Sequence, residues 1–168
     1  MCRKMRKKLI ITIIIIAIGI AVIYLLYYFN FITHKKYTNA DFNIQTYISN
    51  VDKDNDGIDD QTDILNGVKK YISTKPKYMS KYYSGGYPND GYGVCTDVVA
   101  FGLKEAGYDI MELVNKDIIE NFDMYNIKTI DKNIDFRRVR NLKIYFNNNA
   151  IKLTNNVYDI DKWQGGDI

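Results

Sequence analysis

Cys95 is the residue whose type and placement point most directly to chemistry. It lies in residues 93–97, where a glycine-rich loop gives way to apolar residues at helical spacing. A cysteine at a helix start can act as a nucleophile, because the backbone N–H groups there favour the thiolate and can donate to a developing oxyanion. Such a thiol ordinarily works with a histidine base. The single histidine, His34, lies more than sixty residues upstream, so the sequence predicts a thiol site without its base.

A second group of chemistry-bearing residues forms an acidic loop at 52–63. Five of its six acids stand at loop positions 1, 3, 5, 9 and 12, and Gly57 stands at position 6, which is the spacing of calcium-binding loops. The expected calcium ligands are side-chain oxygens and one main-chain carbonyl, from Asp52, Asp54, Asp56, Ile58 (carbonyl), Asp60 and Asp63. The aspartate at position 12 departs from the glutamate of EF-hands and resembles the loops of thrombospondin-type repeats and dockerins. The alternative is a solvated acidic turn that binds no metal tightly.

The spacing of apolar residues predicts the elements that would position these groups. Helices are expected at 42–51, 64–72, 96–106, 111–125 and 141–148. Thr96 or Asp97 can cap the helix after Cys95, and Gly107 can end it in a left-handed conformation. The other segments are predicted as a tyrosine-rich loop, an irregular stretch and a short strand, at 73–93, 131–138 and 151–153. A helix packed firmly on a core gives a nucleophilic cysteine the rigidity that it needs. The alternative is that Cys95 is a small residue of the core.

Residues 9–29 form an uncharged, isoleucine-rich run of 21 residues. As a helix rising about 1.5 Å per residue, this run would span roughly 30 Å, the hydrocarbon thickness of a bilayer. Because five basic residues precede it, the positive-inside rule predicts a cytoplasmic segment at 1–8 and an extracytoplasmic chain beyond it. We therefore expect a single-pass plasma-membrane protein with a linker at 30–40 and one domain at 41–168. A cleaved signal peptide is the alternative, but no small-x-small cleavage site follows the run.

The distribution of charge argues against binding to nucleic acid. Residues 1–36 hold seven of the 23 basic residues and none of the 20 acidic ones. The rest of the chain therefore has 16 basic and 20 acidic residues, a net charge of −4, and no basic stripe that would follow a phosphate backbone. In the predicted topology Cys2 and Cys95 lie on opposite sides of the membrane, so they are not expected to pair within one chain.

Several segments together resemble a bacterial family known as domain of unknown function 1287. They occur in the same order and at similar spacing, at 87–88, 93–98, 133–139, 141–142 and 163–168. The family is similar to NlpC-type papain-like cysteine peptidases, many of which cut peptidoglycan stem peptides. The resemblance implies an α+β fold in which the helix carrying Cys95 packs on a small antiparallel sheet. In such folds the histidine follows the Gly-Asp-Ile/Val segment, so we expect a truncated or split reading frame whose C-terminal sheet is mostly missing.

The resemblance also carries roles to individual residues. Cys95 matches the nucleophile, and Asp97 matches the acid of the Cys-Thr-Asp motif. Asp135, Arg137 and Arg138 match an Asp-x-Arg-Arg segment, for which either substrate carboxylate binding or a buried ion-pair network is expected. Gly165 stands where the family usually has proline.

The function expected from these features is a membrane-anchored thiol hydrolase of the peptidase or amidase type. Its partners would be the membrane, through residues 9–29, and peptidoglycan or another cell-surface substrate. Without a histidine base the chain as given is expected to be inactive. The rival hypotheses are a calcium-dependent surface binding module, which would use the 52–63 loop and nearby tyrosines, and a pseudoenzyme that kept the fold. Ca²⁺ is the cofactor expected.

Overall fold

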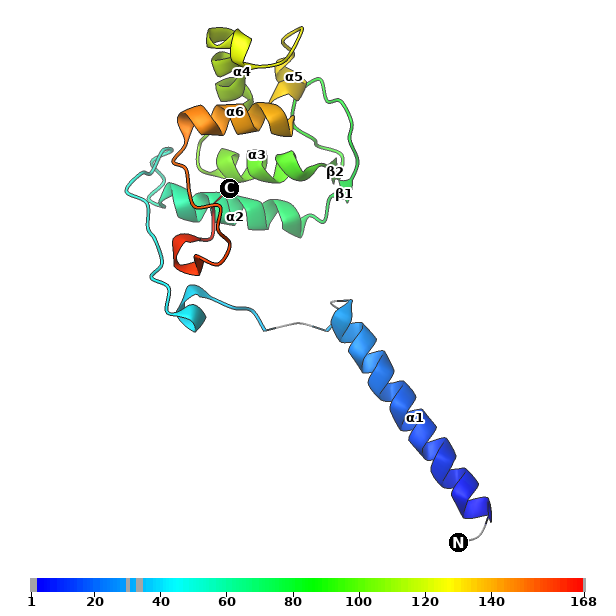
Figure 1. Ribbon diagram of the computed structural model, residues 1–168. Helices are drawn as coiled ribbons and strands as arrows, with labels where there is room; N and C mark the ends of the chain where they lie inside the picture. The colour runs from blue at the N-terminus through cyan, green and yellow to red at the C-terminus, as the bar shows by residue number, and fades with distance from the viewer. Residues whose placement is uncertain (1–2, 30, 33–34, 168) are drawn as a thin grey trace. The chain divides into compact units, whose positions relative to one another are not determined.

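The computed structural model describes residues 3–29, 31–32 and 35–167 (Figure 1). Cys2, His34 and Ile168, which entered the sequence analysis, lie outside the described residues. The chain divides into two compact units, Met1–Asn43 and Ile44–Ile168.

The first unit is dominated by one long apolar helix, α1 (Arg3–Tyr28). Its segment Met5–Tyr28 is long and apolar enough to cross a membrane, and none of its most apolar window is buried within the protein. An N-terminal signal sequence would have the same length and composition. The prediction of an N-terminal apolar helix is therefore confirmed, while its topology stays a prediction.

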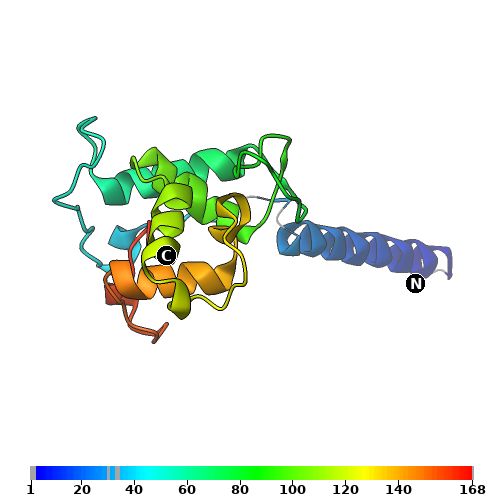
Figure 2. The ribbon, with the colours of Figure 1, turned by 90° about the horizontal axis from the view of Figure 1, so that it is seen from above.

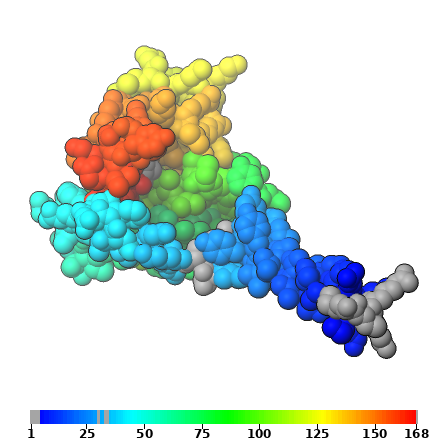
Figure 3. Space-filling view, turned by 60° about the horizontal axis from the view of Figure 1, so that its bottom comes forward, coloured from blue at the N-terminus to red at the C-terminus, as the bar shows by residue number. Residues whose placement is uncertain are grey.

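The helix predicted for residues 42–51 does not form. The 3-10 helix η1 (Asn39–Phe42) is followed by Asn43, whose φ of +56° lies in the left-handed region and interrupts a right-handed helix. Beyond it the backbone bonds to a distant side chain: the Tyr47 N–H donates to Oε1 of Gln164 (3.2 Å), and Nε2 of Gln164 donates to the Gln45 carbonyl (3.1 Å). Figure 3 shows this segment of the second unit beside the C-terminal segment. These long-range bonds take the place of the hydrogen bonds that a helix would have made.

Within the described residues, the second unit contains four main helices and three short ones. The main helices are α2 (Asp60–Ser73), α3 (Cys95–Glu105), α4 (Ile110–Glu120) and α6 (Val139–Asn149). The short ones are η2 (Phe122–Met124), α5 (Lys132–Asp135) and η3 (Ile160–Lys162). The helices predicted at 64–72, 96–106 and 141–148 are confirmed, with ends shifted by up to four residues at α2.

Two other local predictions need correction. The helix expected at 111–125 ends at Glu120, and η2 continues after Asn121 breaks the helical geometry. The stretch at 131–138 contains α5, because the side chain of Asp131 caps it by accepting from the Asn133 N–H at 3.0 Å.

The hydrophobic core is centred on α4. Its residues Ile110, Val114 and Ile118 recur every four positions and are at most 1% exposed. They pack with residues of the surrounding segments, namely Ala100, Tyr125, Phe136 and Leu142. Figures 1 and 2 show α4 beside α3, α5 and α6, which agrees with its contacts to all three. The core therefore fixes α3, the helix that begins at Cys95.

A close contact between α2 and α3 holds the other face of α3. A side chain at Gly102 would bring its Cβ to 2.8 Å from Cγ2 of Val68, and one at Gly67 would come to 2.6 Å from Cβ of Glu105. Both distances are shorter than real Cβ contacts, so the two glycines allow these helices to approach closely. No local pattern in the sequence indicates this role of the two glycines.

The sheet is small. Strand β1 (Lys77–Tyr78) pairs in parallel with β2 (Tyr92–Gly93), in register Lys77 to Tyr92. The strand predicted at 151–153 is absent, since those residues find no partner strand in the described part of the chain. The observed architecture is thus helix-rich with a two-stranded parallel sheet, whereas an antiparallel sheet was expected.

Candidate functional site

Cys95 is exposed, unpaired and the first residue of α3. Strand β2 comes directly before Val94, and Val94 is the residue that precedes the helix. The cap differs from the expectation: Asp97 is at the third helical position, and its Oδ2 accepts from the Val94 N–H at 2.7 Å. The structure therefore presents the thiol to solvent at a helix N-terminus, and it does not place Cys95 in the core.

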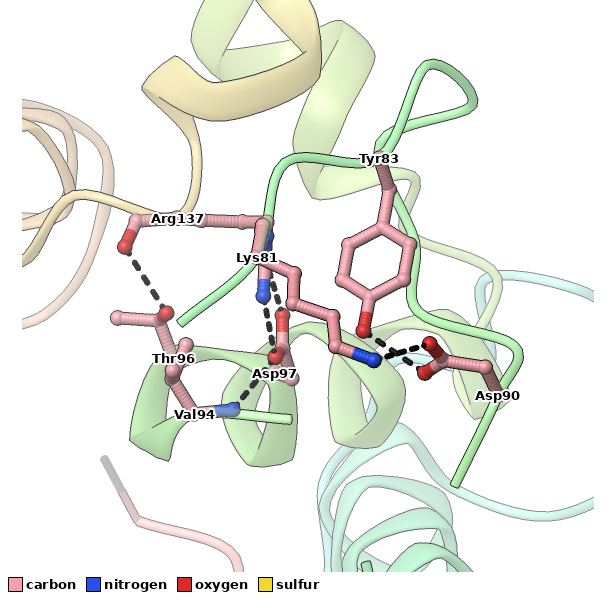
Figure 4. Close-up of polar contacts among 7 residues, drawn as sticks. All are labelled: Lys81, Tyr83, Asp90, Val94, Thr96, Asp97 and Arg137. Carbon is pink, nitrogen blue, oxygen red and sulfur yellow. Dashed lines mark hydrogen bonds and ion pairs between the residues drawn. The ribbon is translucent and has the colours of Figure 1, made fainter. Parts of the chain in front are cut away.

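Asp97 and Arg137 form a buried ion pair directly behind the helix start (Figure 4). Nε of Arg137 donates to Oδ1 of Asp97 at 2.7 Å, and Nη2 donates to Oδ2 at 2.9 Å. Asp97 is fully buried and Arg137 is 6% exposed. The hydrogen bonds to Asp97 raise the pKa of Arg137 above its usual range, against the opposing effect of desolvation. Such a two-point contact between planar groups fixes orientation as well as distance.

Arg137 also ties the helix start to two other segments. Its Nη1 donates to the carbonyl of Lys81 at 2.6 Å, and its own carbonyl accepts from Oγ1 of Thr96 at 3.0 Å. The guanidinium carbon lies 5.0 Å from the centre of the Tyr83 ring. A single side chain thereby joins α3, the loop after β1 and the turn between α5 and α6, and Asp97 has no face open to a substrate.

A second charged group connects the middle of the tyrosine-rich loop to the end of that loop. This contact was not predicted from the sequence. Asp90 accepts from Nζ of Lys81 and from the Tyr83 hydroxyl, both at 2.8 Å (Figure 4). The contact with Lys81, then that with Tyr83, lowers the pKa of Asp90. Desolvation first, and then the bond to Asp90, raises the pKa of Tyr83 to about 12. The Asp-Gly dipeptide at 90–91, which favours a turn, is the sequence feature that could have indicated this contact.

The Asp-x-Arg-Arg segment separates into buried and partly open residues. Asp135 is fully buried, and its Oδ2 accepts from the Asp131 N–H at 2.7 Å. The Arg138 guanidinium lies 3.3 Å from Oδ1 of Asp135 and its side chain is 40% exposed. Of the three residues named for substrate binding, Arg138 is the one with substantial access to solvent.

Tyr71 is a further residue that the sequence analysis did not single out. Its hydroxyl is buried, and among the described residues it has no hydrogen-bond partner. Desolvation is the main cause that raises the pKa of Tyr71, followed by the charge of Asp97. A Cβ at Gly93 would meet this hydroxyl, so a larger residue there would displace the Tyr71 side chain from the helix start. No local pattern in the sequence indicates this contact.

The acidic loop lies elsewhere in the second unit, before α2. Carboxylate oxygens of Asp52, Asp54 and Asp56 lie within 4.8 Å of one another. Asp60 is engaged differently, because its Oδ1 accepts from the Lys53 N–H at 2.7 Å and its Oδ2 accepts from the Tyr108 hydroxyl. The structure thus brings together three of the predicted ligands and gives the Asp60 carboxylate protein partners.

A broad groove of about 1510 Å³ also opens in the second unit. Its walls include Gln61 and Leu103, together with residues of α6 and the C-terminal segment. Cys95 is not among the residues that line it, so the groove does not indicate where a substrate of Cys95 would lie.

Comparison with known proteins gives a family and one relative. A family model described as domain of unknown function (DUF1287) matches residues 65–168. The chain is similar to the uncharacterized protein YijF of Escherichia coli (strain K12), with 34% identity over 113 residues. That match covers 62% of this chain and 55% of YijF, so the chain spans about half the length of this curated relative. No solved structure gives a significant match. The residues matched by the family include Cys95 and Arg137 and exclude the acidic loop.

Proposed function

Because the chain belongs to the family of domain of unknown function 1287, we propose that it is a thiol hydrolase, anchored by α1, with Cys95 as nucleophile. The observation that carries the proposal is an exposed thiol at the first position of a helix whose start is held by the buried Asp97–Arg137 pair. A nucleophile needs a rigid support, and this pair supplies it without occupying the space around the sulfur.

The chemistry proposed for Cys95 is acyl transfer. The thiolate attacks an amide or ester carbonyl, and the new C–S bond forms as the carbonyl oxygen becomes an oxyanion. Backbone N–H groups at the start of α3 are the donors available to that oxyanion. Collapse of the intermediate breaks the C–N or C–O bond, and the leaving group takes a proton from the protonated base. Water then hydrolyses the thioester and regenerates the thiol.

The base in this scheme is a histidine. Residues 35–167 contain no histidine, so the described part of the chain supplies the nucleophile and its support. Asp97 then acts as a positioning residue through the helix start, not by touching substrate. Arg138, being partly open, is the residue proposed to meet a substrate carboxylate.

The substrate class follows from the proposed place of the protein. The resemblance to NlpC-type papain-like peptidases and the N-terminal apolar helix together favour a cell-wall peptide close to the outer face of the plasma membrane. Basic residues in the first turns of α1, ahead of its apolar run at 9–29, support a cytoplasmic N-terminus and an extracytoplasmic second unit.

Alkylation of Cys95 tests whether the helix start activates the thiol. In the full chain with Cys2→Ser, kept in an uncharged detergent, Cys95 should react with iodoacetamide at neutral pH about tenfold faster than an ordinary surface thiol. The matched control is Cys2→Ser/Cys95→Ala/Ser73→Cys, which moves the one thiol to the exposed last residue of α2. Equal rates at the two positions would contradict a primed nucleophile.

Acylation tests the chemistry itself. Incubation of the Cys2→Ser chain with p-nitrophenyl acetate should attach one acetyl group to Cys95, detected by mass spectrometry of the intact chain. Turnover should be slow, because the described residues offer no histidine to activate water. The Cys95→Ala variant should remain unmodified at that site. Alkylation at the faster rate without any acetylation would favour a pseudoenzyme.

A further inference from the structure

The acidic loop before α2 gathers negative charge that no ion pair within the described residues neutralises. Asp52, Asp54 and Asp56 bring carboxylate oxygens within 4.8 Å of one another. Asp52 is half-buried, and the other two side chains are exposed. Like charges at such distances repel, and the repulsion is screened least where water is partly excluded. A cluster of this kind can nevertheless be a solvated turn, so a second observation is needed to indicate a ligand.

That second observation is the carboxylate of Asp63 in the first turn of α2. Asp63 is 4% exposed, and its buried Oδ2 has no hydrogen-bond partner among the residues that the structure describes. A buried carboxylate oxygen without a partner is costly, because water no longer solvates it. Because burial of this oxygen is so unfavourable, it indicates a partner for the carboxylate outside the described protein atoms.

The first turn of α2, which carries Asp63, lies against the acidic loop. The Asp60 N–H donates to the Val51 carbonyl at 2.9 Å, and Oδ1 of Asp60 accepts from the Lys53 N–H at 2.7 Å. Four carboxylates of one twelve-residue segment therefore lie around the start of this helix, where a cation would stabilise them.

The geometry points to a calcium site formed by Asp52, Asp54, Asp56, the main-chain carbonyl of Ile58, and Asp63. All of these donors are hard oxygens, which Ca²⁺ prefers, and residues 52–63 contain no histidine or cysteine that would suit Zn²⁺. Gly57 has a φ of +93°, which is the left-handed turn that lets such a loop wrap an ion. A flexible loop with this many carboxylates also suits Ca²⁺ better than Mg²⁺, which retains its waters and demands strict octahedral geometry.

Asp60 has a different part in this site. Its carboxylate accepts from the Lys53 N–H and the Tyr108 hydroxyl, so it fastens the loop to the segment between α3 and α4. Gly107 lies at the same corner, where an added Cβ would be 2.9 Å from Cβ of Asp54. A bound ion would consequently connect the loop, the start of α2 and the α3–α4 corner, and would stabilise the helix pair that carries Cys95. The inference does not depend on Cys95 being a nucleophile.

Thermal unfolding of the full chain tests the site. The protein, in an uncharged detergent and freed of metal with a chelator, is titrated with CaCl₂ or with MgCl₂ at equal ionic strength. Calcium should raise the melting temperature in a saturable way, with a dissociation constant on the order of 10⁻⁴ M, and magnesium should have a much smaller effect. The same small shift with both salts, or no shift, would overturn the proposal.

Two matched variants identify the ligand. Asp63→Asn should bind calcium at least about tenfold more weakly, because it removes one charged ligand while keeping the shape of the side chain. In chelator, however, it should melt above the parent chain, because it also removes the repulsion. Asp123→Asn makes the same change of charge on the exposed surface of η2 and should behave like the parent in both conditions. Identical calcium responses of the two variants would exclude Asp63 as a ligand and overturn the site.

Discussion

Asp63 and Asp97 are two buried aspartates in the first turns of neighbouring helices, and the fold treats them in opposite ways. Asp97 receives two hydrogen bonds from Arg137, at 2.7 and 2.9 Å, and a third from a backbone N–H. Asp63 follows the acidic loop in the chain, and its buried oxygen has no partner in the described part of the chain. One helix start thus carries its own counter-charge, while the other is suited to a cation from solution.

The difference bears on what each region contributes to stability. The Asp97–Arg137 pair joins residues 40 positions apart, and because it is buried it is screened little by dissolved salt. The acidic loop is local in sequence, and its contribution to stability should change sign with the cation concentration. We therefore expect the region behind Cys95 to be rigid whether or not a cation is present. The stability of the loop before α2 should instead depend on the cation concentration.

The largest effect is expected from removing the counter-charge of Asp97. Arg137→Met leaves a fully buried carboxylate without its partner and should lower the free energy of unfolding by about 3–5 kcal/mol. Urea unfolding followed by circular dichroism measures this loss.

Arg140→Met is the matched control, since Arg140 lies on the exposed surface of α6, three positions further along the chain. Its free energy of unfolding should stay within about 0.5 kcal/mol of the parent. If the two variants unfold at the same urea concentration, the Asp97–Arg137 pair does not stabilise the start of α3.

An intermediate effect is expected where the acidic loop meets the α3–α4 corner. Gly107→Ala places a side chain at a φ of +76° and against Asp54, so it should cost about 1–2 kcal/mol and also weaken the response to calcium. Gly85→Ala adds the same methyl group where nothing lies within 4 Å and φ is not positive, and should be nearly neutral. Differential scanning calorimetry with and without calcium distinguishes the two variants. Equal melting temperatures for both would contradict the close contact between the acidic loop and Gly107.

The smallest effect concerns Asp90, a paired acid at the surface. Its pKa is lowered in the folded chain from an ordinary value of 3.8, so its charge stabilises the fold above that pH and the benefit is lost as pH falls through the lowered pKa. The melting temperature of Asp90→Asn should accordingly lie slightly below that of the parent at neutral pH, and the gap should close in acid. A gap that persists unchanged at low pH would show that the charge of Asp90 plays no part.

Local patterns predicted the helical parts of this protein well. The uncharged run at 9–29 and the apolar spacing around Val114 and Leu142 each correspond to a helix, and Gly107 ends α3 with the expected positive φ. The spacing at 42–51 was equally suggestive, but Gln164 bonds to the backbone there and Asn43 interrupts the helix. A hydrogen bond from a side chain more than a hundred residues away leaves no trace in a local pattern.

The candidate site was predictable in its members but not in their roles. Cys95 at a helix start and the acids at 52–63 are visible from residue type and spacing. Three features depend on which segments pack against these residues: the burial of Asp97 and Asp135, the Tyr71 hydroxyl without a partner among the described residues, and the bonds by which Asp60 holds the loop. Those contacts join residues from distant parts of the chain.

By itself, the sequence determined the apolar N-terminal helix, the helix that begins at Cys95, the uneven distribution of charge and the family, because each depends on residue type and short-range periodicity. Only the tertiary structure decided that Arg137 neutralises Asp97 and that no side chain in the described residues neutralises Asp63. The physical reason is that the cost of a buried charge depends on the groups brought to it by folding, and these come from segments that the local sequence does not specify.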